Sequence, residues 1–290
     1  MAEENLGWEQ IGESAGYLRE RMERLPRVIL ITGSGLGGLA EEIAGSSTLP
    51  YAHIPHFVSA TVPGHAGKLV TGEVAGKGIA LLQGRVHFYE GHSLGKITFP
   101  IRVLHRLGAD TLIVTNAAGG LRQDWQAGDL MLITDHINLV GMAGLNPLRG
   151  PNDERLGPRF VDMSQAYDLG LRQLALAAAD ELGISLRQGT YVMSAGPTFE
   201  TPADVGFLQK IGADAVGMST VPEVIVARHE GMRVLGLSHI SNVIRAPGEQ
   251  GEEKEGTTDS LHQEVLEAGD RVVPKLRALI RRIIDRLDEA

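Results

Sequence analysis

The chain has 290 residues, of which 43% are hydrophobic and 22% charged, so it can bury a sizeable core and is not expected to be disordered. A net charge of −9 argues against nucleic acid and anionic membranes as partners, and the absence of cysteine excludes disulfides, thiolate nucleophiles and cysteine-ligated metal centres. The acidic N-terminus lacks the apolar core of a secretory signal, and no stretch reaches the roughly 20 apolar residues of a membrane helix, which predicts a cytoplasmic protein.

Short apolar runs rich in β-branched residues alternate along the chain with longer helical patterns. In chain order we expect a helix over Glu9–Arg24, a strand over Val28–Thr32, a helix over Leu36–Ile43, strands over Lys68–Val74 and Ile79–Gln83, a helix over Ile97–Leu107, strands over Thr111–Asn116 and Leu130–His136, a helix over Ser164–Leu182, a strand over Thr190–Met193, a helix over Pro202–Lys210, a strand over Ala215–Met218, a helix over Pro222–His229, a strand over Arg233–Ile240 and a helix over Ser260–Leu287.

This alternation predicts an α/β protein with a parallel or mixed sheet. A turn over Ala75–Gly78 predicts an antiparallel hairpin, which argues against a purely doubly wound sheet. No linker divides the chain, so we expect one domain over residues 1–290. The acidic segment 246–258 has almost no apolar residues; it is either a solvated surface loop or, as long loops in compact domains often are, a mobile lid.

A glycine-rich turn, Gly33-Ser34-Gly35-Leu36-Gly37-Gly38, follows the first predicted strand and opens a predicted helix. Backbone N–H groups and the positive end of the helix dipole can hold an anion there, and Ser34 adds a hydroxyl. The turn matches G-x-G-x-x-G, but a dinucleotide site also needs an acidic residue about 20 positions further on. That region reads His53-Ile54-Pro55-His56-Phe57, so the turn favours a phosphate; a plain tight turn remains an alternative.

The next polar segment contains Arg85, His87 and Tyr89 in alternation. An extended backbone would put these three side chains on one side and Glu90 on the other. A guanidinium binds phosphate oxygens bidentately, and a neighbouring imidazole can share the charge. His65 lies between glycines, which suggests a loop that approaches a ligand closely, although this feature alone decides nothing.

Other candidate ligands follow strands later in the chain. The small residues Asn116–Gly120 end one strand, where α/β proteins commonly bind ligands, although tight packing would explain them equally well. Phe199 offers a flat apolar face, and Glu200 with Asn242 offers an acceptor and a donor. This pair matches a 6-oxopurine, whose N1–H donates to a carboxylate and whose O6 and N7 accept from an amide. A 6-aminopurine would meet Glu200 acceptor to acceptor.

As a set, these segments resemble the trimeric, 6-oxopurine-preferring class of purine nucleoside phosphorylases, over most of the chain from Gly33 to His262. The resemblance implies a single α/β domain whose central mixed, partly barrel-like sheet is flanked by helices. It implies that phosphate is held by Ser34, His65, Arg85, His87, the amide of Ala117 and Ser219, that ribose is contacted by Tyr89, Met218 and His262, and that the purine is bound by Phe199, Glu200 and Asn242. The implied catalytic residues are His87, Glu200 and Asn242, while Phe160 would reach a neighbouring subunit's site in a homotrimer. One departure is Ser241, where the family commonly has threonine.

The implied reaction is reversible phosphorolysis of inosine, guanosine and their deoxy counterparts to the free base and pentose 1-phosphate, in purine salvage. Inorganic phosphate would be a co-substrate, with no organic cofactor; the ten histidines form no H-E-x-x-H pattern, so no metal is expected. A methylthioadenosine phosphorylase is the nearest alternative, and Asn242 and His262 count against it. An NAD-dependent oxidoreductase and a non-catalytic nucleoside-binding protein are further alternatives.

Overall fold

The structure is a computed structural model that describes residues 6–33, 37–62, 66–244 and 258–290, with the backbone alone at 37, 39 and 42 and over 258–271. The strands are β1 (Val28–Thr32), β2 (Ala44–Pro50), β3 (Lys68–Val74), β4 (Lys77–Gln83), β5 (Thr111–Gly120), β6 (Leu130–Asn138), β7 (Leu186–Met193), β8 (Ala215–Gly217) and β9 (Arg233–Val243). The α-helices are α1 (Trp8–Arg19), α2 (Leu94–Arg106), α3 (Leu139–Met142), α4 (Leu169–Glu181), α5 (Pro202–Lys210), α6 (Val221–His229) and α7 (Thr258–Asp285). Short 3₁₀ helices cover Gly37–Glu42, Tyr51–His53, Phe88–Glu90 and Leu287–Glu289.

The strands described above form one mixed nine-stranded sheet in the order β2-β3-β4-β1-β5-β8-β7-β6-β9, and β9 also pairs with β5. That last pairing closes β5, β8, β7, β6 and β9 into a ring, which makes the sheet partly barrel-like. The strands β1, β4, β5 and β9 run parallel to one another, because β1 pairs in parallel with β4 and β5, and β5 with β9. The predicted fold class, a single domain with a mixed, partly barrel-like sheet flanked by helices, is confirmed.

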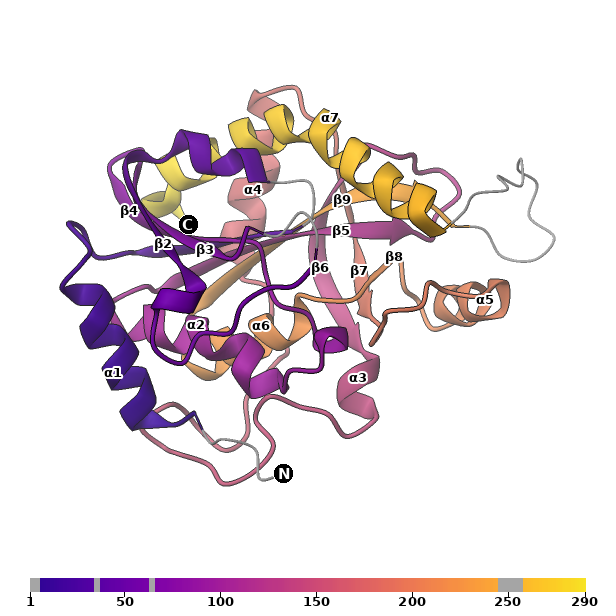
Figure 1. The fold of residues 1–290 in the computed structure, drawn as a ribbon. Helices are drawn as coiled ribbons and strands as arrows, with labels where there is room; N and C mark the ends of the chain where they lie inside the picture. The colour runs from indigo at the N-terminus through magenta and orange to yellow at the C-terminus, as the bar shows by residue number, and fades with distance from the viewer. Residues whose placement is uncertain (1–5, 34–36, 63–65, 245–257) are drawn as a thin grey trace.

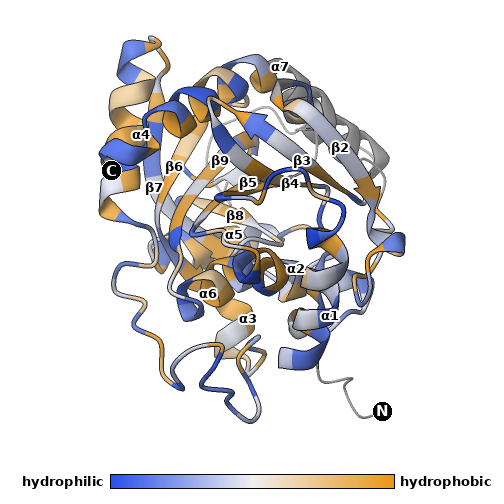
Figure 2. Cartoon of the chain, turned by 90° about the vertical axis from the view of Figure 1, so that its left-hand side faces the viewer, coloured by the Kyte–Doolittle hydropathy of each residue, from blue (hydrophilic) through white to orange (hydrophobic). Residues whose placement is uncertain are grey.

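Helices cover both sides of the sheet (Figure 1). One core packs α1, α2 and α6 against the sheet, and a second core packs α4 and α7 against its other side. The strand β1 is buried at all five positions, as expected for a parallel strand covered on both faces. Apolar residues accordingly concentrate on the strands and on the helix faces that meet them (Figure 2). No helix within the described ranges is both long and apolar enough to cross a membrane.

Most predicted elements are present, with shifted ends. The hairpin between β3 and β4 turns at Ala75 and Gly76, which both have positive φ, as a two-residue hairpin turn requires. The helix predicted from Ser164 begins later, because the side chain of Asp168 accepts a hydrogen bond from Leu171 N at 2.9 Å and caps α4. The strand β2 was not predicted.

The helix predicted over Leu36–Ile43 is wrong in type. The chain forms a short 3₁₀ helix over Gly37–Glu42 and then enters β2, which pairs antiparallel with β3. This segment therefore lacks the α-helix of a dinucleotide-binding βαβ unit. Ser34, in the turn itself, lies outside the described residues, as does the predicted lid up to residue 257.

Candidate active site

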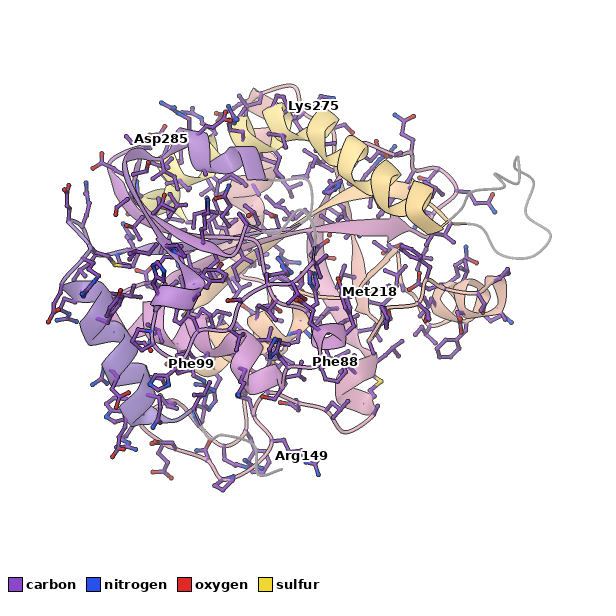
Figure 3. All side chains as sticks on the ribbon, in the orientation of Figure 1. Phe88, Phe99, Arg149, Met218, Lys275 and Asp285 are labelled. Atoms are coloured by element: carbon purple, nitrogen blue, oxygen red, sulfur yellow. The ribbon has the colours of Figure 1, made fainter. Side chains whose placement is uncertain are left out.

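A cavity of about 370 Å³ opens where β1, β4, β5 and β9 reach their carboxyl ends. It is lined by Gly33, Val62, Arg85, His87, Tyr89, Asn116, Ala117, Ala118, Gly119, Pro197, Phe199, Glu200, Val216, Gly217, Met218, Ser219, Ser241, Asn242 and Ile244. Met218, labelled in Figure 3, follows β8 at this place. Larger cavities of about 510 and 660 Å³ exist, but neither is lined by the predicted phosphate, ribose or purine ligands that the structure describes.

Two strand ends approach each other closely at the floor of the cavity. A Cβ at Gly33 would lie 2.9 Å from the Cα of Asn116, nearer than Cβ contacts occur in proteins. Glycine at this position therefore lets the end of β1 pack directly on β5. The backbone of Ala117, next to that contact, lines the cavity.

Arg85 is held in a buried charged cluster beside the cavity. Its Nη1 lies 3.5 Å from Oε1 of Glu223, and both side chains are 4% exposed. The same nitrogen donates to Oγ1 of Thr220 at 3.0 Å, and Nη2 donates to the carbonyl of Thr115. These contacts fix the guanidinium in one orientation, so it needs little rearrangement to meet an anion.

His87 lies next to Arg85 and its imidazole is stacked on Tyr89, with ring centroids 4.8 Å apart. Burial, together with the charge of Arg85, lowers the pKa of His87 to about 4, although the Glu90 carboxylate opposes the shift. The imidazole is therefore neutral at pH 7 and both donates and accepts a hydrogen bond.

The expectation that Glu90 points away from His87 is wrong. The backbone is extended only as far as His87 and then turns into the 3₁₀ helix Phe88–Glu90, which brings the third residue back. Oε1 of Glu90 accepts from His87 N at 2.6 Å and lies 3.3 Å from Nδ1, while Oε2 accepts from Thr61 N at 2.7 Å. Glu90 thus orients the histidine.

Glu200 and Asn242 also line the cavity, with the aromatic ring of Phe199 beside them. Burial raises the pKa of Glu200, although Ser194 Oγ, which donates to Oε1 at 3.2 Å, opposes the shift. Ser241 Oγ donates to Oδ1 of Asn242 at 2.8 Å. This contact draws the amide oxygen towards Ser241, whose hydroxyl also lies 3.3 Å from the carbonyl of Ala118, and leaves the two amide hydrogens of Asn242 as donors. The serine that departs from the family's usual threonine keeps the hydroxyl that makes this contact.

Nine of the predicted site residues line this one cavity: Arg85, His87, Tyr89, Ala117, Phe199, Glu200, Met218, Ser219 and Asn242. Ser34 and His65 lie outside the described residues, and His262 belongs to α7 where only the backbone is described. The individual roles of all these residues remain predictions.

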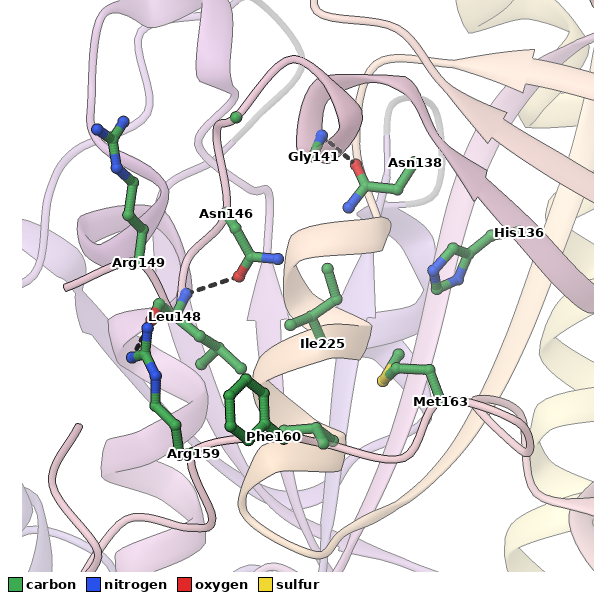
Figure 4. A pocket seen from close by; sticks show the side chains of 12 residues that line it. His136, Asn138, Gly141, Asn146, Leu148, Arg149, Arg159, Phe160, Met163 and Ile225 are labelled. Atoms are coloured by element: carbon green, nitrogen blue, oxygen red, sulfur yellow. Dashed lines mark hydrogen bonds between the residues drawn. The ribbon is translucent and has the colours of Figure 1, made fainter. Parts of the chain in front are cut away.

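Phe160 lies apart from the cavity of its own chain. It is 88% exposed and lines the separate cavity of about 510 Å³, close to Arg159, Leu148 and Ile225 (Figure 4). The two cavities share no lining residue. Phe160 therefore does not line its own chain's predicted active site.

Two residues that shape the site were given no role by the sequence. Thr220 and Glu223, both buried, hold Arg85 from the segment that begins α6. The sequence signal for them is Pro222, which is favoured in the first turn of a helix and so marks its start directly after Ser219 and Thr220.

Comparisons with known proteins agree with this fold and site. A family model described as the phosphorylase superfamily matches residues 27–285, so the chain is a member of that superfamily. Purine nucleoside phosphorylase of Rattus norvegicus is 50% identical over 287 residues, covering 98% of this chain and 97% of that protein. Crystal structures of Schistosoma mansoni purine nucleoside phosphorylase match with TM-scores of 0.89: the adenosine complex at 39% identity, covering 96% of this chain and 97% of that one, and the inosine complex at 38% identity, covering 96% of each. Within the superfamily, this chain belongs to the purine nucleoside phosphorylases.

The family membership confirms the resemblance stated from the sequence. It does not favour the methylthioadenosine phosphorylase or the NAD-dependent oxidoreductase. The short 3₁₀ helix after the glycine turn gives an independent structural reason against the second of these.

Proposed function

We propose that this chain catalyses the reversible phosphorolysis of 6-oxopurine nucleosides, inosine and guanosine and their deoxy forms, to the purine base and pentose 1-phosphate. Inorganic phosphate is the co-substrate, and no metal or organic cofactor takes part. The observation that carries the proposal is one cavity lined both by a buried arginine beside a neutral histidine and by a carboxylate beside an oriented amide.

Phosphate binds in the part of the cavity formed by Arg85, His87, Ser219 and the amide of Ala117. The bond between C1′ and the purine loosens first, so positive charge builds on the sugar. The phosphate beneath C1′ stabilises that charge, and one of its oxygens then bonds to C1′ as the purine leaves. Tyr89, whose ring stacks on His87, and Met218 contact the ribose between the phosphate and the base.

The purine leaves with growing negative charge on N7 and O6, towards which the amide of Asn242 donates. Glu200 accepts the N1–H of a 6-oxopurine. An adenine has no hydrogen on N1, so it leaves the carboxylate facing a lone pair. The Schistosoma enzyme has been crystallised with adenosine as well as inosine, so the proposed preference concerns turnover rather than the ability to bind.

The active unit is a homotrimer in which Phe160 completes the site of the adjacent subunit. Its 88% exposure supports this, as does Met142, which is 77% exposed and follows Gly141, a residue that lines the same cavity as Phe160, because large apolar side chains on a surface commonly mark protein interfaces. The cytoplasmic location and the lid over 246–258 remain predictions from the sequence.

The test is inosine turnover with and without phosphate, followed by the appearance of hypoxanthine. We expect release that depends on phosphate and saturates with it, and an Arg85→Ala variant whose phosphate KM rises or whose turnover collapses. Release at full rate in phosphate-free buffer would make the chain a hydrolase. Binding of inosine without any release would make it a nucleoside-binding protein.

A further inference from the structure

The residue after Ser219 has an unusual backbone conformation. Thr220 has φ 76° and ψ −50° and is fully buried. Val221 N donates to the carbonyl of Ser219 at 2.9 Å, which closes a three-residue γ-turn around Thr220. A β-branched residue rarely adopts a positive φ, because its side chain crowds the backbone there. Glycine would take this conformation without strain, so the threonine side chain must offer something that glycine lacks.

The Thr220 hydroxyl joins three groups of the site. Its Oγ1 accepts from Nη1 of Arg85 at 3.0 Å and from Nδ2 of Asn116 at 2.8 Å. A hydroxyl has two acceptor lone pairs and one hydrogen, and a guanidinium can only donate. With both lone pairs engaged, the hydroxyl hydrogen points to its remaining neighbour, the Oγ of Ser219, at 3.3 Å.

This arrangement sets the direction of the Ser219 hydroxyl. Because Ser219 Oγ accepts from Thr220, its own hydrogen is left to donate towards the cavity that it lines. The Ser219 amide is held as well, since it donates to the hydroxyl of the buried Tyr191 at 3.3 Å. The γ-turn therefore presents a serine hydroxyl as a donor, which is the polarity that an anion requires.

We propose that Thr220 is a positioning residue for the phosphate substrate: its hydroxyl holds the Arg85 guanidinium and turns the Ser219 hydroxyl hydrogen towards the phosphate. The inference rests on the proposed function, because it assigns a role within the phosphate part of the same site. It goes beyond the residues that line the cavity, because Thr220 does not line it and acts only through Arg85 and Ser219, which do.

Thr220→Val tests the hydroxyl, since it keeps the branched shape and replaces only the oxygen. Losing a hydrogen bond to a charged group weakens binding by about tenfold or more, so we expect the phosphate KM to rise by that factor. The inosine KM should stay within about threefold, since Thr220 touches none of the predicted purine ligands. Thr220→Ser restores the hydroxyl and should recover most of the native phosphate KM.

Thr98→Val is the matched control for losing a buried threonine hydroxyl. Thr98 is 1% exposed and its Oγ1 donates to the carbonyl of Leu94 within α2. This variant should lower the melting temperature without moving the phosphate KM. If Thr220→Val does not fold, Thr220→Gly removes the same hydroxyl at a backbone position that glycine adopts readily, and the same rise in phosphate KM is expected.

A double-mutant cycle separates positioning from general damage. Ser219→Ala should cost much less in the Thr220→Val background than in the native chain, because the valine has already misdirected the serine. A folded Thr220→Val or Thr220→Gly enzyme with the native phosphate KM, or strictly additive effects, would overturn the inference. Either result leaves the proposed function standing, whereas a native chain whose inosine cleavage ignores phosphate defeats the proposed function itself.

Discussion

Because folding lowers the pKa of His87, acidification should reduce the free energy of unfolding. In the folded chain the pKa is lowered from 6.5 to about 4, whereas the unfolded chain keeps the ordinary value. Between about pH 4 and pH 6.5 the histidine binds a proton in the unfolded state but not in the folded state, so the free energy of unfolding rises with pH over this range. The contribution is fully present above pH 6.5 and is lost as the pH falls towards 4. The two pKa values give a total loss of roughly 3 kcal/mol, of which about 2 kcal/mol is gone at pH 5.

The assay is urea unfolding at pH 7.5 and pH 5, at one protein concentration, for the native chain and for His87→Gln. Glutamine stays neutral at both pH values, so the variant lacks the titration of His87. It keeps the backbone amide of residue 87 that donates to Glu90, and it loses the contact between Glu90 and the imidazole. We expect the native chain to lose about 2 kcal/mol more than the variant. An equal loss of unfolding free energy in the two proteins would show that His87 titrates normally. It would refute the argument that the imidazole beside Arg85 is neutral at pH 7.

Three further substitutions test other parts of the site. Asn242→Asp should shift the ratio of kcat/KM for inosine over adenosine towards adenosine by about tenfold or more, because the donor to O6 and N7 becomes an acceptor; an unchanged ratio speaks against base reading by this amide. Phe160→Ala should raise the inosine KM by about tenfold, because an aromatic contact buried in the adjacent subunit's site is lost. If sedimentation shows that the variant is a trimer and its kinetics are native, Phe160 has no role in the adjacent site. Glu223→Gln should lower the unfolding free energy by about 3 kcal/mol by leaving Arg85 without its carboxylate, yet increase the rise in melting temperature that phosphate produces; identical phosphate-induced shifts would contradict this.

The position of the site was predictable from the sequence. Parallel strands present their carboxyl ends at one edge, so polar residues that follow such strands are expected to gather there. Ala117 and Asn242 lie towards the ends of the parallel strands β5 and β9, which their apolar runs identify, and both line the cavity. Ser219 lines it as well, but it follows β8, which runs antiparallel to β5, so this rule does not account for its position. The hairpin was predictable for an equally local reason, the turn at Ala75 and Gly76.

What the sequence could not predict depends on conformations that local preference disfavours or does not distinguish. Alternation assigns Glu90 to the far side only if the chain stays extended, and it does not. Thr220 is a poor candidate for positive φ, so only the assembled site explains its γ-turn. The strand β2 is exposed at its first five positions and owes its conformation to pairing with β3, not to an apolar pattern of its own.

The charge of the site explains how a chain of net charge −9 can accept a phosphate dianion. A buried guanidinium with no counter-ion would destabilise the empty site by several kcal/mol, and Glu223, 3.5 Å from Arg85, offsets that cost. The pair is then close to neutral, and His87 adds no charge at pH 7. We therefore expect phosphate to be recognised mainly by oriented hydrogen-bond donors: the fixed guanidinium, the Ala117 amide and the Ser219 hydroxyl. Donors held in place by other parts of the fold stabilise charge without rearrangement, and this suits a reactant that must bind as phosphate and leave as a sugar phosphate.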